Sequence, residues 1–263
     1  MKRRLKLQGG IIAKNITDYV RSCVDDFKHF VSIDSFPVFD VKSKEITIEK
    51  SLKQGFDSTA AVFYDIPTGR HTLEIWSKLS LPQMNAEYLV FHELTHIWDA
   101  DVFSQRDKLK HMSNKGYTEY HAAQIDFMKL LGAKNIAEPF SFSMKQTVET
   151  FGDTKTAKGF VDMPRNLAVE LISRDDFPAN VETLATTMGA IFNYYGRRSI
   201  CKMCAIDYVA NEDMSVIAGF IGEDTVKTLD AFMLGWLDTT RVSLIDALYG
   251  KMIVALAQRN NLA

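Results

Sequence analysis

Apolar residues near the start of the chain recur three or four positions apart. They are Tyr19, Val20, Cys23, Val24, Phe27 and Phe30. Residues at this spacing share one face of an α-helix, and polar residues occupy the positions between them. The pattern predicts an amphipathic helix over about residues 15 to 30.

The hydrophobic period then changes to that of β-strands. Residues 45 to 49 (EITIE) and 71 to 76 (HTLEIW) alternate between polar and apolar side chains, and residues 60 to 64 (AAVFY) form a short apolar run. The turn-forming residues Pro67, Thr68 and Gly69 separate the last two segments. We expect three short strands, of which the last two form a hairpin.

Two helices are predicted next. The segment SLPQ at residues 80 to 83 has the form of a capping box with a proline in the first turn, which favours a helix from about 81 to 100. A polar segment over 104 to 110 is expected to be a solvent-exposed connection. A second helix is predicted over about 115 to 131, with Lys129 in its last turn and Gly132 as its C-terminal cap.

Helical spacing dominates after about residue 140. Apolar stripes lie within 181 to 195, 226 to 233 and 242 to 253, and such stripes are typical of helices that face a core. The expected class is α+β. Region 1–135 would hold a small sheet and both helices of a candidate site, and region 136–263 would be helical and pack against it as one globular unit.

Composition and charge exclude several classes of protein. A chain of 263 residues with 46% apolar and 24% charged residues is typical of a globular protein. A net charge of −2 gives no overall field for nucleic acid or an anionic membrane, and neither partner is expected. The basic start, MKRRLKLQGG, lacks the apolar run of an export signal. Three cysteines are too few for a disulfide framework. The expected location is the cytoplasm, although a non-classically exported effector would share this composition.

The helix expected at 81 to 100 contains the pattern H-E-x-x-H. On a helix, His92 and His96 lie about 40° apart around the axis, so both can bind one metal ion through ring nitrogens. Glu93 adjoins His92 and can reach a water on that metal without being a ligand. Val90, Leu94 and Ile97 would pack against the sheet. The alternative is that these polar residues serve only solubility or hydrogen bonding, but the strand and cap before the helix favour a metal site.

A catalytic zinc ion needs a third protein ligand and leaves the fourth position to water. His111, Glu119 and His121 follow the motif in the sequence. Glu119 is favoured, because the loop after His96 lets the next helix return alongside the first. His121 is the main alternative, although the three-histidine pattern places a glycine where this chain has Asp99.

These features resemble the gluzincin metallopeptidases, which have an HExxH helix after an alternating strand and a glutamate on the next helix. HELTH, and a glycine shortly before Glu119, are similar to the thermolysin group, and the compact chain is closer in style to intracellular ImmA/IrrE-type peptidases. The resemblance covers about residues 59 to 131. It implies a zincin-like fold and one Zn²⁺ held by His92, His96 and Glu119.

The resemblance also implies a function. The chain would be a zinc-dependent peptidase in which Glu93 is the general base that takes a proton from a metal-activated water. An extended peptide or protein substrate would pair with the edge strand near His71 to Trp76. The second hypothesis is an inactive zincin-fold regulatory or interaction protein that retains the metal site.

The sequence departs from the thermolysin group at two points. An aspartate four residues after the glutamate ligand orients the first histidine in that group, but Ala123 stands there in this chain. Asp99, Asp101 and Asp126 are the alternative carboxylates. No downstream motif supplies a histidine or tyrosine for the oxyanion. Four tyrosines could either donate to it or pack in the core: Tyr117, Tyr120, Tyr194 and Tyr195.

Two further motifs have ordinary explanations. Cys201 and Cys204 form a single C-x-x-C without the second pair that a structural zinc site needs, so ordinary thiols are expected. Arg197 and Arg198 either bind a substrate carboxylate or lie at a solvated helix end.

Overall fold

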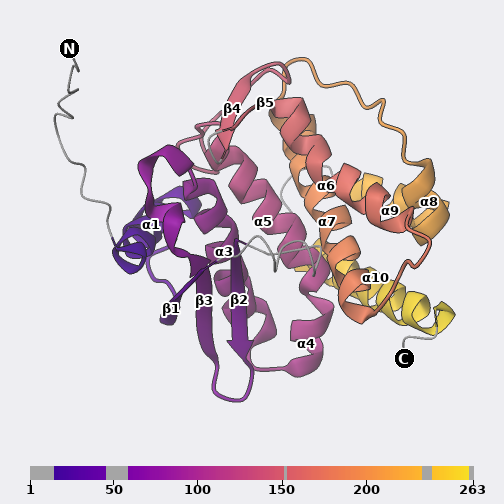
Figure 1. The fold of residues 1–263 in the computed structure, drawn as a ribbon, viewed down its shortest axis with the longest axis horizontal. Coiled ribbons are helices and arrows are strands. Elements are labelled where there is room, and N and C mark those ends of the chain that lie inside the picture. The colour runs from indigo at the N-terminus through magenta and orange to yellow at the C-terminus, as the bar shows by residue number, and fades with distance from the viewer. Residues whose placement is uncertain (1–14, 46–58, 151–152, 233–238, 261–263) are drawn as a thin grey trace, which may run out of the picture.

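The computed structural model describes residues 15–45, 59–150, 153–232 and 239–260. A three-stranded sheet and helix α1 lie at one end of the molecule, and helix α10 lies at the other, with long helices between them (Figure 1). The predicted α+β class is confirmed, because most of the described chain is helical and its two sheets are small.

Helix α1, Ile16–Val31, confirms the first prediction. The side chain of Asn15 caps its start by accepting a hydrogen bond from the backbone N–H of Thr17, and Ser32 ends it in the left-handed conformation. The buried residues include Val20, Cys23, Phe27 and Phe30, as the spacing indicated. Phe27 and Phe30 pack edge-to-face on Phe91 of the HExxH helix, so this face of α1 helps to fix that helix.

The sheet has the order β1-β3-β2, with strands Phe39–Lys44, Ala60–Asp65 and Arg70–Trp76 in chain order. Strand β3 pairs antiparallel with β2, which confirms the hairpin, and parallel with β1. The expectation that His71 to Trp76 form an edge is wrong, because β3 has partners on both sides. Strand β2 contacts the HExxH helix, which lies beside the hairpin of β2 and β3 (Figure 1). The predicted strand at Glu45 to Glu49 falls outside the described residues, except Glu45, which follows β1.

The HExxH helix α3 spans Glu87–Asp99 and begins later than predicted. Residues 77–80 and 82–84 form short 3₁₀ turns, and Asn85 adopts a left-handed conformation with φ of 42°. This conformation stops helical hydrogen bonding, so α3 starts only after it. The Ser80 hydroxyl donates to the carbonyl of Ser77 and does not cap a helix. Val90, Leu94 and Ile97 are fully buried, as predicted.

The chain then reverses through a π-helical turn at Ala100–Ser104 and the short helix α4, Lys108–Ser113. Part of the polar segment predicted as a connection therefore belongs to α4. Helix α5 spans Lys115–Leu130 and confirms the second predicted site helix. Gly132 follows it with φ of +85°, a value that glycine adopts without strain, so its predicted place at the helix end is confirmed.

The C-terminal half contains five helices among the described residues. They are α6 (Ala157–Ile172), α7 (Val181–Cys204), α8 (Ser215–Ile221), α9 (Glu223–Phe232) and α10 (Thr239–Arg259). A hairpin of β4 (Thr147–Thr150) and β5 (Asp153–Thr156) precedes them and was not predicted, because its strands are short and polar. Nowhere in the described chain is a helix both long and apolar enough to cross a membrane.

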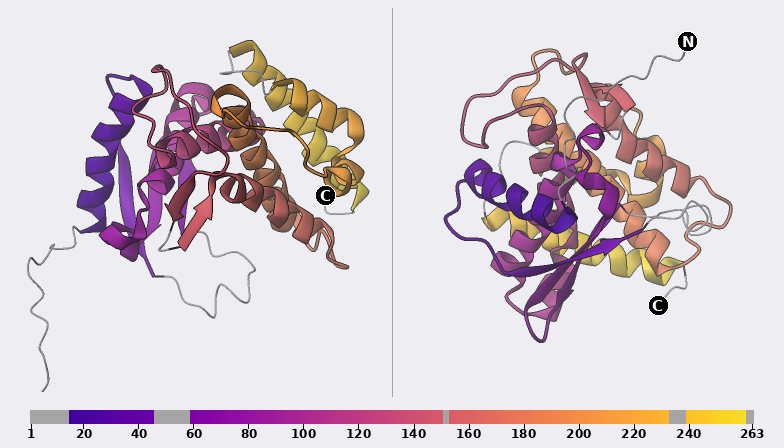
Figure 2. Two further views of the ribbon diagram at one scale, coloured as in Figure 1. Left: turned by 90° about the horizontal axis from the view of Figure 1, so that it is seen from above. Right: turned by 60° about the vertical axis from the view of Figure 1, so that its left-hand side comes forward.

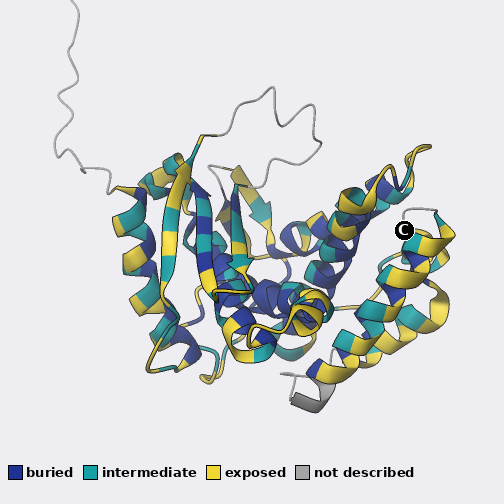
Figure 3. Cartoon of the chain, turned by 90° about the horizontal axis from the view of Figure 1, so that it is seen from below, coloured by how far each residue is buried: buried dark blue, intermediate teal, exposed yellow. Residues whose placement is uncertain are grey.

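Helices α5 and α7 pack together across the expected boundary between residues 135 and 136. Their contact lies between the sheet and α10 (Figure 2), and buried residues gather in the middle of the molecule (Figure 3). Gln124 donates to the hydroxyl of Ser199 at 2.8 Å. Gly196 lets the two backbones approach closely, because a Cβ there would lie 2.1 Å from the carbonyl oxygen of Tyr120.

Gly196→Ala is expected to destabilise the protein by about 3 kcal/mol or more, because the added methyl group meets backbone that can yield only if α5 moves. Gly219→Ala in α8 is the control, since its Cβ has no neighbour within 4 Å. This control should stabilise the protein by about 0.5–1 kcal/mol through helix propensity. Urea unfolding of both variants measures the difference, and equal stabilities would contradict the close helix contact.

Candidate metal centre

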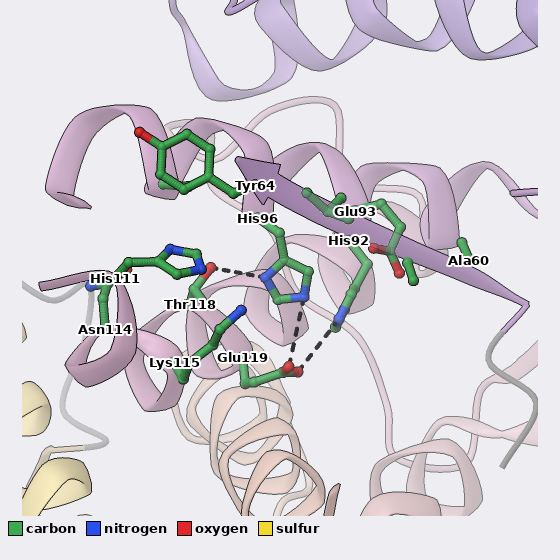
Figure 4. Close-up of a pocket in the computed structure, with 13 residues that line it drawn as sticks. Ala60, Tyr64, His92, Glu93, His96, His111, Asn114, Lys115, Thr118 and Glu119 are labelled. Carbon is green, nitrogen blue, oxygen red and sulfur yellow. Dashed lines mark hydrogen bonds and ion pairs between the residues drawn. The ribbon is translucent and has the colours of Figure 1, made fainter. Parts of the chain in front are cut away.

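Helices α3 and α5 bring His92, His96 and Glu119 together (Figure 4). One ligand atom from each residue lies within 4.8 Å of the other two. The Nε2 atom of His92 is 3.7 Å from Glu119 Oε2, and that of His96 is 3.9 Å from Glu119 Oε1. The three residues predicted as metal ligands thus form one cluster that could hold a metal ion.

The other ring nitrogen of each histidine already has a partner. His92 Nδ1 lies 2.9 Å from Asp126 Oδ2, and His96 Nδ1 lies 2.9 Å from the hydroxyl of Thr118. A carboxylate only accepts, so Nδ1–H of His92 must donate to Asp126. Both rings therefore direct Nε2 toward Glu119, which is the orientation that metal binding requires.

The donor set fits zinc. Two neutral imidazole nitrogens and one carboxylate oxygen are a common ligand set for catalytic Zn²⁺. Ligand distances of about 2.0–2.1 Å in a tetrahedron place the ligand atoms about 3.3 Å apart. One ligand atom from each of the three residues lies within 4.8 Å of the other two, so the side chains would have to draw together to reach that spacing around a metal ion.

Glu93 and the three candidate ligands line the same cavity of about 310 Å³. Its carboxyl group lies between His92 and strand β2 (Figure 4), and the residue is only 6% exposed. Burial raises the pKa of Glu93 to about 7, although the charge of His92 opposes this rise. A carboxyl group with a pKa near neutrality is suited to accept a proton and release it again.

Polar side chains form the opposite wall of the cavity. Tyr64 comes from β2, His111 from α4, and Lys115 from the start of α5 (Figure 4). His111 Nδ1 is 3.3 Å from the Ser104 hydroxyl, and burial with the nearby Lys115 lowers its pKa to about 4. His111 is therefore neutral at pH 7 and offers one ring N–H. The sequence offers His111 only as a candidate ligand, because the fold of α4 is needed to place it on this wall.

His121, the alternative third ligand, does not join the cluster. Its Nδ1 atom lies 3.0 Å from Asp99 Oδ1, and its ring stacks on Tyr117. Residues that are two positions apart on a helix lie on nearly opposite faces. His121 therefore cannot share the face of α5 from which Glu119 reaches His92 and His96. Asp99 is thereby used by His121 and does not orient His92.

Asp126 is the carboxylate that orients His92, one of the three alternatives from the sequence. It lies seven residues after Glu119, so both project from the same face of α5. Arg197 holds Asp126 and does not face the cavity, and Arg198 is only 6% exposed and bonds Tyr208 and Asp230. The arginine pair does not lie at a solvated helix end, because α7 continues past it to Cys204, and neither arginine lines the cavity of the cluster.

The remaining candidates belong to the core. The four tyrosines considered as oxyanion donors are all buried, and none lines the cavity of the cluster. Cys201 is buried and Cys204 is half-buried, and both are free thiols. Burial raises both thiol pKa values, which lowers their reactivity and agrees with the expectation of ordinary thiols.

The two carboxylates beside His92 favour its protonated form when no metal is bound. Burial alone would lower the pKa of His92, but the carboxylates of Asp126 and Glu119 outweigh it and raise the pKa to about 10. Burial lowers the pKa of His96 to about 3. Burial opposes ionisation of Glu119, yet the two histidines hold its pKa at about 2. At pH 7, His92 is thus charged between two carboxylates, while His96 is neutral.

Metal affinity should therefore rise with pH. A metal ion on His92 Nε2 displaces one proton, and one displaced proton corresponds to about a tenfold gain in affinity per pH unit below the pKa of His92. Chelator competition with zinc at pH 6, 7 and 8 measures this slope. An affinity that does not change over this range would contradict the protonated state of His92.

Comparisons of the chain with protein families, with curated proteins and with solved structures found no match.

Proposed function

We propose that the protein is a zinc-dependent peptidase. The observation that carries the proposal is the convergence of His92, His96 and Glu119 beside a cavity that also contains Glu93. The helix supplies two ligands and a base within one turn, and the next helix supplies the third ligand. This combination is what metal-assisted hydrolysis of a peptide bond requires.

Each residue has a defined task in the proposed reaction. His92, His96 and Glu119 would hold Zn²⁺, which when bound makes water a stronger acid and polarises a carbonyl group. Glu93 accepts the proton of the attacking water and passes it to the leaving amine. His111 and Lys115 are the donors on the opposite wall, where they can stabilise negative charge that develops on the scissile carbonyl oxygen.

Strand β2 is the proposed docking strand for the substrate. Ala60, Ala61 and Val62 line the cavity, and in the described sheet the pairing of β2 is with β3 only. An extended peptide can add to such a strand through backbone hydrogen bonds, which brings its carbonyl groups past Glu93. The proposed site of strand addition therefore moves from His71–Trp76 to the neighbouring strand of the hairpin.

The test is to measure metal content and peptide hydrolysis on one preparation. The purified chain is loaded with zinc, freed of excess metal and incubated with a mixed peptide library whose cleavage is followed by mass spectrometry. Hydrolysis should disappear after chelation and return with zinc. Metal uptake without hydrolysis would favour the inactive regulatory protein. Failure to take up zinc, with His92 and His96 intact, would contradict both functions.

A further inference from the structure

Helix α7 faces the side of α5 that carries Glu119 and Asp126. It presents Asn193 and Arg197, which are one helical turn apart and so lie on one face. Asn193 Nδ2 donates to Glu119 Oε2 at 2.9 Å. Arg197 binds Asp126. The helix from the C-terminal half thus contacts one candidate ligand directly and the partner of another.

The Arg197 guanidinium is fixed on several sides. Its Nη2 donates to Asp126 Oδ2 at 3.1 Å, and its Nε donates to Oδ1 at 3.4 Å. Its Nη1 donates to the carbonyl of Phe160 at 3.0 Å, and the group lies 3.8 Å from the centroid of the Phe160 ring. Because two N–H groups of this guanidinium bind the two oxygens of Asp126, they fix the plane of the carboxylate as well as its position.

Asp126 transmits this constraint to the metal centre. Its side chain is only 2% exposed, and Oδ2 accepts from both Arg197 and His92. Without Arg197, this buried carboxylate would lose both guanidinium hydrogen bonds and could rotate together with the imidazole. The direction of His92 Nε2, and so the placement of one ligand atom, depends on both ends of this chain of contacts.

We propose that Asn193 and Arg197 are positioning residues of the metal centre, through which α7 sets the orientation of Glu119 and His92. The inference rests on the proposed metal site. It adds that the affinity for metal is determined by the helical C-terminal half as well as by the motif.

The adjacent arginine provides a matched control. Arg198 has a similarly buried side chain, at 8% exposed compared with 12% for Arg197. Its guanidinium donates to the Tyr208 hydroxyl and to Asp230, each at 2.7 Å, and within the described chain its ion pairs are with Asp230 and Glu212, away from the metal-site residues. Loss of either arginine removes a buried charge from α7. Only the loss of Arg197 is expected to change the orientation of His92, because Arg197 shares Asp126 with it.

The experiment compares Arg197→Met, Arg197→Lys, Arg198→Met and Asn193→Leu with the wild type. Zinc affinity is measured by chelator competition, the visible spectrum of the Co²⁺-loaded protein reports ligand geometry, and melting with excess chelator reports the stability of the metal-free fold. Arg197→Met should weaken zinc binding about 10–100-fold and alter the Co²⁺ bands. Asn193→Leu should weaken it about 10-fold. Arg197→Lys should recover part of the loss.

Arg198→Met should lower the melting temperature while keeping zinc affinity within about 3-fold of wild type. The inference is overturned if folded Arg197→Met and Asn193→Leu bind zinc as the wild type does, or if Arg198→Met weakens binding equally. Asn193→Leu removes no charge, so it keeps the test informative if Arg197→Met does not fold. If the wild-type protein binds no zinc, the proposed function itself is contradicted. That outcome is distinct from a failure of the inference about α7, which requires a wild type that binds zinc.

Discussion

Glu93→Gln should retain zinc and lose peptide hydrolysis by about 10²–10⁴-fold. The amide has nearly the shape of the carboxyl group but cannot accept a proton, so the cavity and the ligands His92, His96 and Glu119 are kept while the base is lost. Zinc content by atomic absorption and hydrolysis of the best peptide from the library are measured on the same sample.

The control for this result is Glu87→Gln, the same substitution in the first turn of the same helix. Glu87 pairs with Lys129 at 3.0 Å and does not line the cavity, so its loss should leave the rate nearly unchanged. If Glu93→Gln hydrolyses peptides as fast as the wild type, Glu93 is not the base.

Glu119→Gln should weaken zinc binding by about 10²–10³-fold. Structural zinc sites, which have four protein ligands, bind the metal with about 10–16 kcal/mol. One ligand therefore accounts for about 3–4 kcal/mol. The amide keeps the size of Glu119 and can still accept from Asn193, so packing against α7 is preserved. Chelator competition at a fixed pH measures the change in affinity.

His121→Gln separates the two candidate third ligands. His121 is held by Asp99 outside the cluster, and glutamine can still donate to that carboxylate. Zinc affinity should therefore stay within about 3-fold of the wild type. If His121→Gln weakens zinc binding and Glu119→Gln leaves the zinc affinity unchanged, the third ligand is His121.

The sequence was most informative where chemistry depends on spacing along one element. His92 and His96 are four residues apart, so any helix places them side by side, and the face of Val90, Leu94 and Ile97 could be read from the same period. The hairpin of β2 and β3 followed from its turn residues. Glu119 required only that α5 return alongside α3.

The features that the sequence left open or missed depend on tertiary geometry. Positions 123 and 126 both lie near the face of α5 that carries Glu119. Which of them contacts His92 depends on the way α3 crosses α5, and the contact is made by Asp126. The sheet order depends on β1, which pairs with β3 from outside the predicted hairpin. The start of α3 is set by the left-handed conformation of Asn85, which no hydrophobic period records. The proposed role of Arg197 depends on its contact with Asp126, which lies about 70 residues earlier in the chain, on α5.

The packing of α7 on α5 also orders events during synthesis. His92, His96 and Glu119 leave the ribosome close together, whereas the contacts of Asn193 and Arg197 span 74 and 71 residues of chain. A nascent chain therefore contains every candidate ligand before Asn193 and Arg197 have been synthesised. Early metal capture by such a chain would be weak and poorly oriented, and full affinity would develop only when the last half of the protein has folded onto the first.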